Sequence, residues 1–222
     1  MGQGARWAIA SVGVGLAGCW FAVASSGPAA RAGDPPVDGD ASSGPTKFAY
    51  VGTKTCRTCH LGEHKSWEAT RMAKTFDALA PGGGRDMRVK VGLDPDKDYR
   101  GDGECLACHV TGFGHPGGYE VPEKGDRTAA REAKARESVG CEACHGPGSE
   151  YVKLFREIAE SGRKYRPEEL YAAGLNRPEA SMCIGCHNER STGFKAGIRF
   201  DYEKMKDQGR HEVFPLKQRE GP

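Results

Sequence analysis

The sequence predicts a mostly α-helical protein with short helices, long loops and little regular β structure. Two observations support this fold class. Only 37% of the 222 residues are hydrophobic while 32 are glycine, so aliphatic side chains are too few to fill an ordinary core. Eight of the nine cysteines belong to four copies of one short motif, spread over the chain after residue 55. Something other than leucine and valine must fill the interior.

The chain is organised as an N-terminal export segment, a linker and one domain. Residues 1–32 have the character of a signal peptide or N-terminal anchor, with an apolar stretch at 7–24. Cleavage with release, retention as an anchor and lipid attachment at Cys19 are three alternatives. Residues 33–46 are polar and predict a flexible linker, and residues 47–222 form the domain. All three alternatives place the domain in the periplasm or otherwise outside the cytoplasmic membrane.

The four motifs share the pattern C-x-x-C-H. Cysteines at i and i+3 lie on one face of a helical turn, where both can bond to one edge of a porphyrin. The next histidine lies beside them and can ligate the iron. The motif residues are Cys56, Cys59 and His60; Cys105, Cys108 and His109; Cys141, Cys144 and His145; and Cys183, Cys186 and His187.

Zinc sites and disulfides are the competing interpretations of these cysteines. Paired C-x-x-C units can build a four-cysteine zinc site, and eight cysteines in an exported chain could form four bridges. Neither requires a histidine after every second cysteine. We therefore predict four covalently attached haem c groups, each with an iron bound by the motif histidine, and a multihaem cytochrome c fold wrapped around them.

The number of histidines limits how the four irons can be ligated. After the four motif histidines, only His64, His115 and His211 remain. At least one iron therefore has methionine, a weaker ligand or nothing at its sixth position. His115 lies in a glycine-rich loop, where a surface role or one at a haem edge is favoured over ligation.

Met72 is the methionine candidate. Residues 61–80 predict a helix, stopped by a proline and three glycines, with His64, Glu68, Met72 and Phe76 on one stripe. Periodicity alone favours Met72 as a core residue and His64 as a surface residue. Other helices are expected near 125–138, 149–161, 167–173 and 201–209.

Composition excludes two classes of protein. The formal net charge of +2 gives no strong basic field, which argues against nucleic-acid binding. No apolar run of 18 residues occurs after residue 24, which argues against a membrane bundle. Contact with a membrane is expected only through the N-terminal anchor or lipid.

Several stretches carry a family resemblance, which extends over about residues 48–215. The chain resembles the tetrahaem cytochrome c-554 family, whose best-known member accepts electrons from hydroxylamine oxidoreductase. The stretches are Tyr50–Gly52, Ser66–Thr70, Leu93–Tyr99, Cys108–Gly114, Gly117–Tyr119 and Val139–Gly148.

The resemblance implies three histidine-capped haems and an open, five-coordinate haem on His109. Met72 occupies the position of a family histidine, which would make it the cap of the third haem, on His145. The family's late histidine matches His211 and implies a cap for the fourth haem. A histidine expected shortly after Gly148 is missing. Tyr151 and Lys153 stand nearby, and His115 or an open site are the alternatives for the first haem.

These features predict an exported electron-transfer protein rather than an enzyme. Its partners would be a redox donor and a redox acceptor, such as a hydroxylamine oxidoreductase-like enzyme or a quinone-linked cytochrome. The alternative is a haem enzyme that reduces or oxidises nitric oxide, hydroxylamine or nitrite at the open haem on His109.

Overall fold

The computed structural model describes residues 47–215 and Glu220. The chain divides into two units, residues 1–42 and 43–222, and the features below belong to the second. The expectations for residues 1–32 and 33–46, including Cys19, lie outside the described residues. None of the helices in the described part has the length and hydropathy that crossing a membrane requires.

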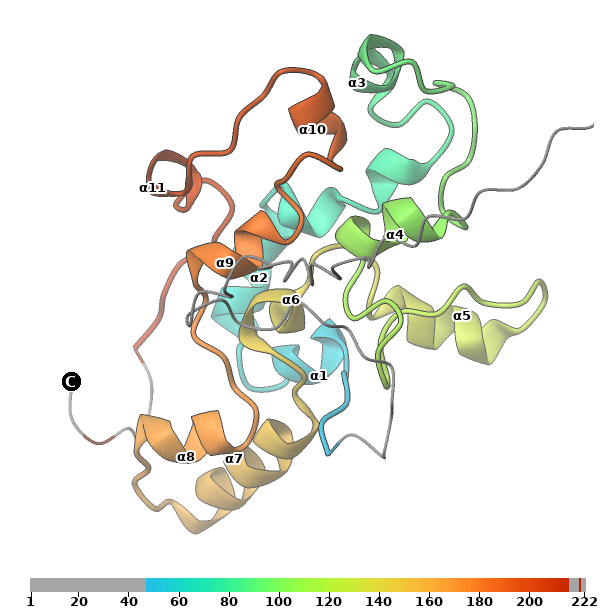
Figure 1. Cartoon of the computed structure of the whole chain (residues 1–222). Helices are drawn as coiled ribbons and strands as arrows, with labels where there is room; N and C mark the ends of the chain where they lie inside the picture. The colour runs from blue at the N-terminus through green and yellow to red at the C-terminus, as the bar shows by residue number, and fades with distance from the viewer. Residues whose placement is uncertain (1–46, 216–219, 221–222) are drawn as a thin grey trace, which may run out of the picture. The chain divides into compact units, whose positions relative to one another are not determined.

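Short helices joined by loops make up the fold (Figure 1). Among the described residues, β pairing is limited to a single bridge between Val110 and Glu137. The mostly α class is thereby confirmed. The helices are α1 Thr53–Arg57, α2 Leu61–Glu68, α3 Arg85–Lys90, α4 Gly103–His109, α5 Arg127–Lys134, α6 Cys141–His145, α7 Ser149–Ser161, α8 Pro167–Ala172, α9 Ala180–Ile184, α10 Thr192–Lys195 and α11 Tyr202–Met205, with short 3₁₀ turns η1 Met72–Lys74 and η2 Asp77–Leu79.

The helices expected at 149–161 and 167–173 are confirmed as α7 and α8. Gly162 ends α7 in the left-handed region, with φ of 68°, which glycine adopts without steric cost. Pro167 begins α8 at the first helical position, where its missing N–H costs no hydrogen bond. Local sequence signals therefore define both ends of this helical pair.

The charged helix expected at 125–138 is confirmed over a shorter range, as α5. Asp126 caps its start by accepting hydrogen bonds from the N–H groups of Thr128 and Ala129, both at 2.9 Å. Its outer face is charged, while Ala133 is buried against the core.

The helix expected at 201–209 is reduced to the single turn α11.

The continuous helix expected over 61–80 is wrong. Helix α2 ends at Glu68, and only the turns η1 and η2 follow. In a continuous helix the Phe76 N–H would bond to the Met72 carbonyl. Instead Phe76 N–H donates to Ser138 Oγ at 3.2 Å, and the Met72 carbonyl accepts from Val139 N–H at 3.2 Å. Tertiary hydrogen bonds have replaced the helical ones.

The expected stripe of four residues is broken in the same way. His64 and Glu68 share α2, whereas Met72 and Phe76 belong to different turns. His64, expected at the surface, is only 7% exposed and packs edge-on against the Trp67 ring at 5.3 Å. Its Nδ1 makes no hydrogen bond.

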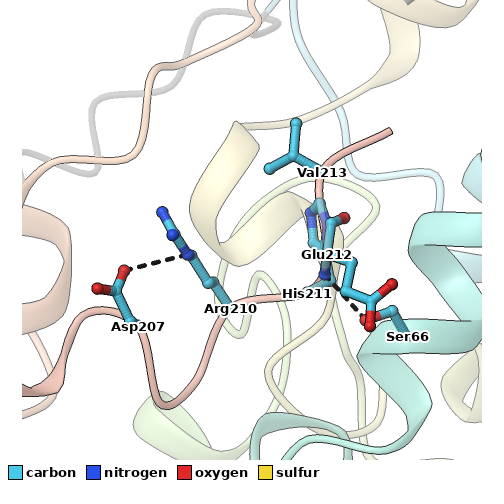
Figure 2. Close-up of a pocket in the computed structure, with 6 residues that line it drawn as sticks. All are labelled: Ser66, Asp207, Arg210, His211, Glu212 and Val213. Atoms are coloured by element: carbon cyan, nitrogen blue, oxygen red, sulfur yellow. Dashed lines mark hydrogen bonds and ion pairs between the residues drawn. The ribbon is translucent and has the colours of Figure 1, made fainter. Parts of the chain in front are cut away.

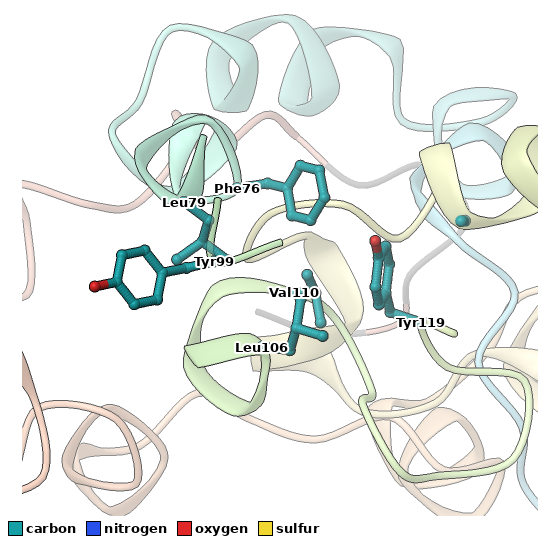
Figure 3. Packing of buried hydrophobic residues seen from close by; sticks show 7 residues of the cluster. Phe76, Leu79, Tyr99, Leu106, Val110 and Tyr119 are labelled. Atoms are coloured by element: carbon teal, nitrogen blue, oxygen red, sulfur yellow. The ribbon is translucent and has the colours of Figure 1, made fainter. Parts of the chain in front are cut away.

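Two small clusters supply the buried apolar side chains. One, shown in Figure 3, joins the segment 76–99 to α4 and the loop after it, with the Phe76 and Tyr119 rings 5.5 Å apart. The other lies between α7 and α8, around Ile158, Tyr165 and Leu170. Neither is large, in agreement with an interior that bound haem completes.

A buried arginine holds the segment 78–97 together, and sequence reasoning did not anticipate it. Arg88 is only 5% exposed and lies 4.6 Å from the centre of the Tyr99 ring. Its guanidinium donates to four backbone carbonyls in turns that lack regular secondary structure. The acceptors are Ala78 at 2.7 Å, Ala80 at 2.9 Å, and Pro95 and Lys97 at 3.0 Å.

We predict that Arg88→Met lowers the free energy of unfolding by about 3 kcal/mol, because it leaves four inward-facing carbonyls without donors. Arg85→Met on the same helix is the matched control. Arg85 is exposed and pairs with exposed Asp96, so its replacement should cost less than about 0.5 kcal/mol. Urea unfolding of the two holoproteins, followed by far-ultraviolet circular dichroism, measures both values. Equal stability of the two variants would contradict the prediction.

Candidate haem sites

Each of the four motifs folds as one helical turn. Helices α4 and α6 contain the second and third motifs completely. The first and fourth motifs continue past the ends of α1 and α9, but their histidine N–H groups still reach the first cysteine. His60 N–H bonds to the Cys56 carbonyl at 3.0 Å, and His187 N–H to the Cys183 carbonyl at 2.8 Å. Both cysteines of every motif therefore lie on one side of a turn, as attachment to one porphyrin edge requires.

The eight motif cysteines carry no disulfide in the structure. A structural zinc site needs four ligands around one point. Within residues 47–215 and Glu220, no three histidine, cysteine, aspartate or glutamate side chains converge in that way. The described residues therefore show neither of the two competing arrangements.

The motifs are neighbours in a definite order. The Cys56 thiol of the first motif lies beside the Cys141 thiol of the third, and their interaction raises the pKa of Cys56 and lowers that of Cys141. Cys108 of the second motif lies beside Cys186 of the fourth, which lowers the pKa of Cys108 to about 6. Cys144 of the third motif is close enough to the fourth for Cys183 to raise its pKa, after the larger effect of burial. These interactions link the first motif to the third, the third to the fourth and the fourth to the second.

A buried carboxylate joins the first and third motifs. Glu142, between the two cysteines of the third motif, is only 4% exposed. Its oxygens accept from the N–H groups of Val51 at 2.9 Å, Gly52 at 2.7 Å and Gly148 at 2.7 Å. A buried carboxylate is tolerated only when it is well hydrogen-bonded, and three backbone donors meet that condition. This Glu142 clamp fixes the start of α1 against the start of α7.

Gly52 is required at its place in the clamp. Its φ of 83° lies in the left-handed region, and an added Cβ would approach the Ala135 Cβ to 2.9 Å. At the next residue, the Thr53 N–H bonds to the Ala135 carbonyl at 2.9 Å. Helix α1 therefore begins against the end of α5 as well as against the third motif.

The imidazole of His109 is oriented by the backbone. Its Nδ1 lies 2.6 Å from the Thr75 carbonyl, to which it can only donate, so Nε2 is left as the ligand atom. Thr75 Oγ1 donates in turn to the His109 carbonyl at 3.1 Å. A carbonyl behind a ligating histidine is a common way to fix its tautomer and ring orientation. The described contacts place no hydrogen-bonding or aromatic partner at His109 Nε2.

His211 faces His145, with ring centroids 6.1 Å apart and ring planes inclined by 39°. Two imidazoles that bind one metal ion from opposite sides, with bonds of about 2 Å, have centroids roughly 6 Å apart. His211 Nδ1 lies 2.6 Å from the Glu212 carbonyl, which leaves its Nε2 as the ligand atom. The separation fits one haem iron between the two rings.

The resemblance implied Met72 opposite His145 and His211 opposite His187. In the structure the ring that lies beside His145 is that of His211. Met72 lies half-buried against Gly209, and no described contact places it opposite a motif histidine. His187 instead stacks on the Phe200 ring, with centroids 4.4 Å apart.

The segment that carries His211 is tied to α2. Glu212 N–H donates to Ser66 Oγ at 2.9 Å, and Arg210 Nε lies 3.1 Å from a carboxylate oxygen of Asp207. These residues, with Val213, line an open pocket around His211 (Figure 2). Ser66 therefore helps to position the imidazole of His211.

Burial favours the neutral form of two motif histidines. It lowers the pKa of His187, and it lowers the pKa of His145 with a smaller contribution from His211. Metal binding requires the neutral imidazole, so these environments suit iron ligands.

His60 faces α7 rather than another histidine. Its Nε2 lies 3.1 Å from Tyr151 Oη, and its ring centroid lies 6.1 Å from that of Phe155. Lys153 is exposed and pairs with Glu150 at 2.7 Å. His115 is exposed beside the Tyr50 ring, and no contact described for it involves a motif histidine.

Sequence reasoning missed Glu142, Thr75 and the Ser66 contact. Glu142 occupies one of the two x positions of the third C-x-x-C-H motif, which the motif leaves undefined. A carboxylate inside a motif that is expected to be buried could still have indicated a buried hydrogen-bonded group. No sequence signal identifies the Thr75 carbonyl, because every residue has a carbonyl and only the fold decides which one faces an imidazole.

Four helical attachment turns, each ending in an imidazole, define a c-type cytochrome with several haems. A family model described as cytochrome c554 and c-prime matches residues 55–146, which contain the first three motifs. A solved structure, the reduced state of cytochrome c554 from Nitrosomonas europaea, is 30% identical with a TM-score of 0.66, over 78% of this chain and 90% of that chain. The chain belongs to the cytochrome c554 family.

Among curated proteins, cytochrome c-554 of Nitrosomonas europaea is 34% identical over 142 residues, which is 62% of this chain. The match spans 57% of the length of that relative. Family membership confirms the resemblance, the helical fold class and the haem c cofactors that the sequence predicted.

We predict that Glu142→Gln lowers the free energy of unfolding by about 3 kcal/mol, because an amide offers one acceptor oxygen where two buried N–H groups and one half-buried N–H group need partners. Glu157→Gln on α7 is the control, since Glu157 is exposed and pairs with Arg163 at the surface. Thermal unfolding and haem content by the pyridine haemochrome assay are measured for both. A Glu142→Gln protein as stable as the control would contradict a structural role for the clamp.

Proposed function

We propose that this chain is an exported tetrahaem cytochrome that carries electrons between two redox partner proteins. The observation that supports this most directly is the spatial order of the four attachment turns, because every motif has another motif as its neighbour. When bound, each haem supplies a one-electron iron couple. The order first, third, fourth, second offers a continuous route through the domain.

The contribution of the chain is to hold, orient and shield the cofactors. The Glu142 clamp fixes the first and third motifs, which are the first two along the route, against each other. The carbonyls of Thr75 and Glu212 orient the imidazoles of His109 and His211 by accepting from Nδ1. Two opposed imidazoles at His145 close one iron against external ligands, as suits electron transfer rather than substrate binding.

Location and partners follow from the sequence and the family. The apolar stretch at 7–24 supports export, with the periplasm as the compartment in a bacterium. An uncleaved anchor or a lipid on Cys19 would hold the domain at the membrane. A hydroxylamine oxidoreductase-like enzyme is the proposed donor and a quinone-linked cytochrome the proposed acceptor, both on the family resemblance.

A second function has one observation in its favour. The described contacts give His109 Nε2 no distal partner, so its iron would be open to nitric oxide, hydroxylamine or nitrite. No proton-donating side chain is identified at that position, and reduction of nitrogen compounds requires protons. Electron transfer therefore remains the first proposal.

A reductive titration tests the main proposal. The full-length holoprotein should take up four electrons per chain, one for each motif, and pass them to an oxidised cytochrome without consuming a small molecule. Hydroxylamine or nitric oxide, supplied with an electron donor or acceptor, should not be turned over. Catalytic consumption of either compound by the purified protein would favour the enzyme instead.

The proposed pair of ligands at the third haem is tested by His211→Ala. Loss of one imidazole should leave an iron open, so the reduced variant should bind carbon monoxide at one haem more than the wild type. His115→Ala is the matched control, because His115 is exposed and should leave carbon monoxide binding unchanged. Binding is read from the visible absorption spectrum. A His211→Ala protein that behaves like the control would overturn this pairing.

A further inference from the structure

The sixth ligand of the first haem can be inferred from the two sides of His60. On one side, Nδ1 lies 3.9 Å from a carboxylate oxygen of Glu63 on the next helix. On the other side, Nε2 lies 3.1 Å from Tyr151 Oη. A ligating histidine commonly has a carboxylate behind one ring nitrogen and the metal at the other. The Glu63 oxygen is at ion-pair distance from Nδ1, beyond hydrogen-bond distance, and we infer that the metal side of His60 is the Nε2 side, on which Tyr151 lies.

Tyr151 is held in place by the segment that also positions the first motif. It lies in the first turn of α7, three residues after Gly148, whose N–H donates to the Glu142 carboxylate. Its ring stacks on Phe155 with centroids 5.7 Å apart, and Phe155 packs edge-on against buried Tyr165 at 5.9 Å. The hydroxyl therefore has a fixed direction toward His60.

Other side chains near this face lack a suitable donor atom. The Phe155 ring has its centroid 6.1 Å from that of His60, about the separation seen between His145 and His211, but carries no donor. Lys153 is exposed and paired with Glu150. Among the contacts described for His60, the Tyr151 oxygen is the one donor on the metal side.

We propose that Tyr151 is the axial ligand opposite His60 on the first haem. On ferric iron the phenol would release its proton to solvent and bind through Oη, with no change in oxidation state. Two metal–ligand bonds of about 2 Å would place Nε2 and Oη roughly 4 Å apart, about 1 Å more than their 3.1 Å hydrogen-bond distance in the structure. Tyrosine is an established haem ligand in proteins.

This ligand would distinguish the first haem from its neighbours. An anionic oxygen stabilises ferric iron over ferrous iron more than a neutral imidazole does, so the first haem should have a lower midpoint potential than it would with histidine. The first motif is also one end of the proposed route. The ligand assignment needs only the haem, whereas the effect on electron flow rests on the proposed function.

Three variants test the assignment in the full-length holoprotein. Tyr151→Phe keeps the stacking on Phe155 and removes only the oxygen. Tyr151→His offers an imidazole instead. Tyr171→Phe, on α8, is the matched control, because Tyr171 is 40% exposed and lies outside the cluster. The readouts are resonance Raman and electron paramagnetic resonance spectra of the ferric protein, carbon monoxide binding of the reduced protein, and a redox titration.

The ferric wild type and Tyr171→Phe should show iron–phenolate vibrations from one haem, and Tyr151→Phe should lose them. Tyr151→Phe should also bind carbon monoxide at least as readily as the wild type. Tyr151→His should convert that haem to a low-spin, two-histidine spectrum and raise one midpoint potential.

A wild type without phenolate vibrations would overturn the proposal, as would a Tyr151→Phe spectrum equal to that of the wild type. If the Tyr151 hydroxyl does not bind the iron and only donates a hydrogen bond to another group bound there, the wild type will lack phenolate vibrations. Failure here would leave the electron titration of the chain unaffected.

Discussion

The Glu142 carboxylate is the interaction on which the relation between the first and third motifs depends. It lies inside the third motif and binds backbone N–H groups that precede α1 and α7. Burial makes each of these hydrogen bonds costly to lose, since neither the charge nor the donors can turn to water. One side chain therefore sets the placement of two attachment turns and of the helix that carries Tyr151.

Backbone and short polar groups do much of the orienting in this protein. The carbonyls of Thr75 and Glu212 face the Nδ1 atoms of His109 and His211, and Ser66 anchors the segment that brings His211 to His145. Arg88 serves the loops in a similar way by binding four carbonyls. A chain with few aliphatic residues thus relies on directed hydrogen bonds around the space that haem fills.

Local signals predicted some elements well and others poorly. The helix α7 matched its expected range because its glycine end and apolar pattern are local to the segment. The expected helix over 61–80 failed because Ser138 and Val139, more than 60 residues away, take the N–H of Phe76 and the carbonyl of Met72. The spacing of hydrophobic residues within a segment carries no information about tertiary hydrogen bonds that replace the helical ones. The same failure placed His64 at the surface instead of in the interior.

The sequence by itself determined the cofactor class and its attachment points, because covalent attachment requires cysteine and histidine at fixed spacing within one turn. It also showed that histidines were too few to close all four irons. Only the tertiary structure decided which side chains lie beside the motif histidines. His211 rather than Met72 lies beside His145, and Tyr151 lies beside His60, although each partner is far from its histidine in the chain. Such pairings depend on packing across long separations, which no local pattern encodes.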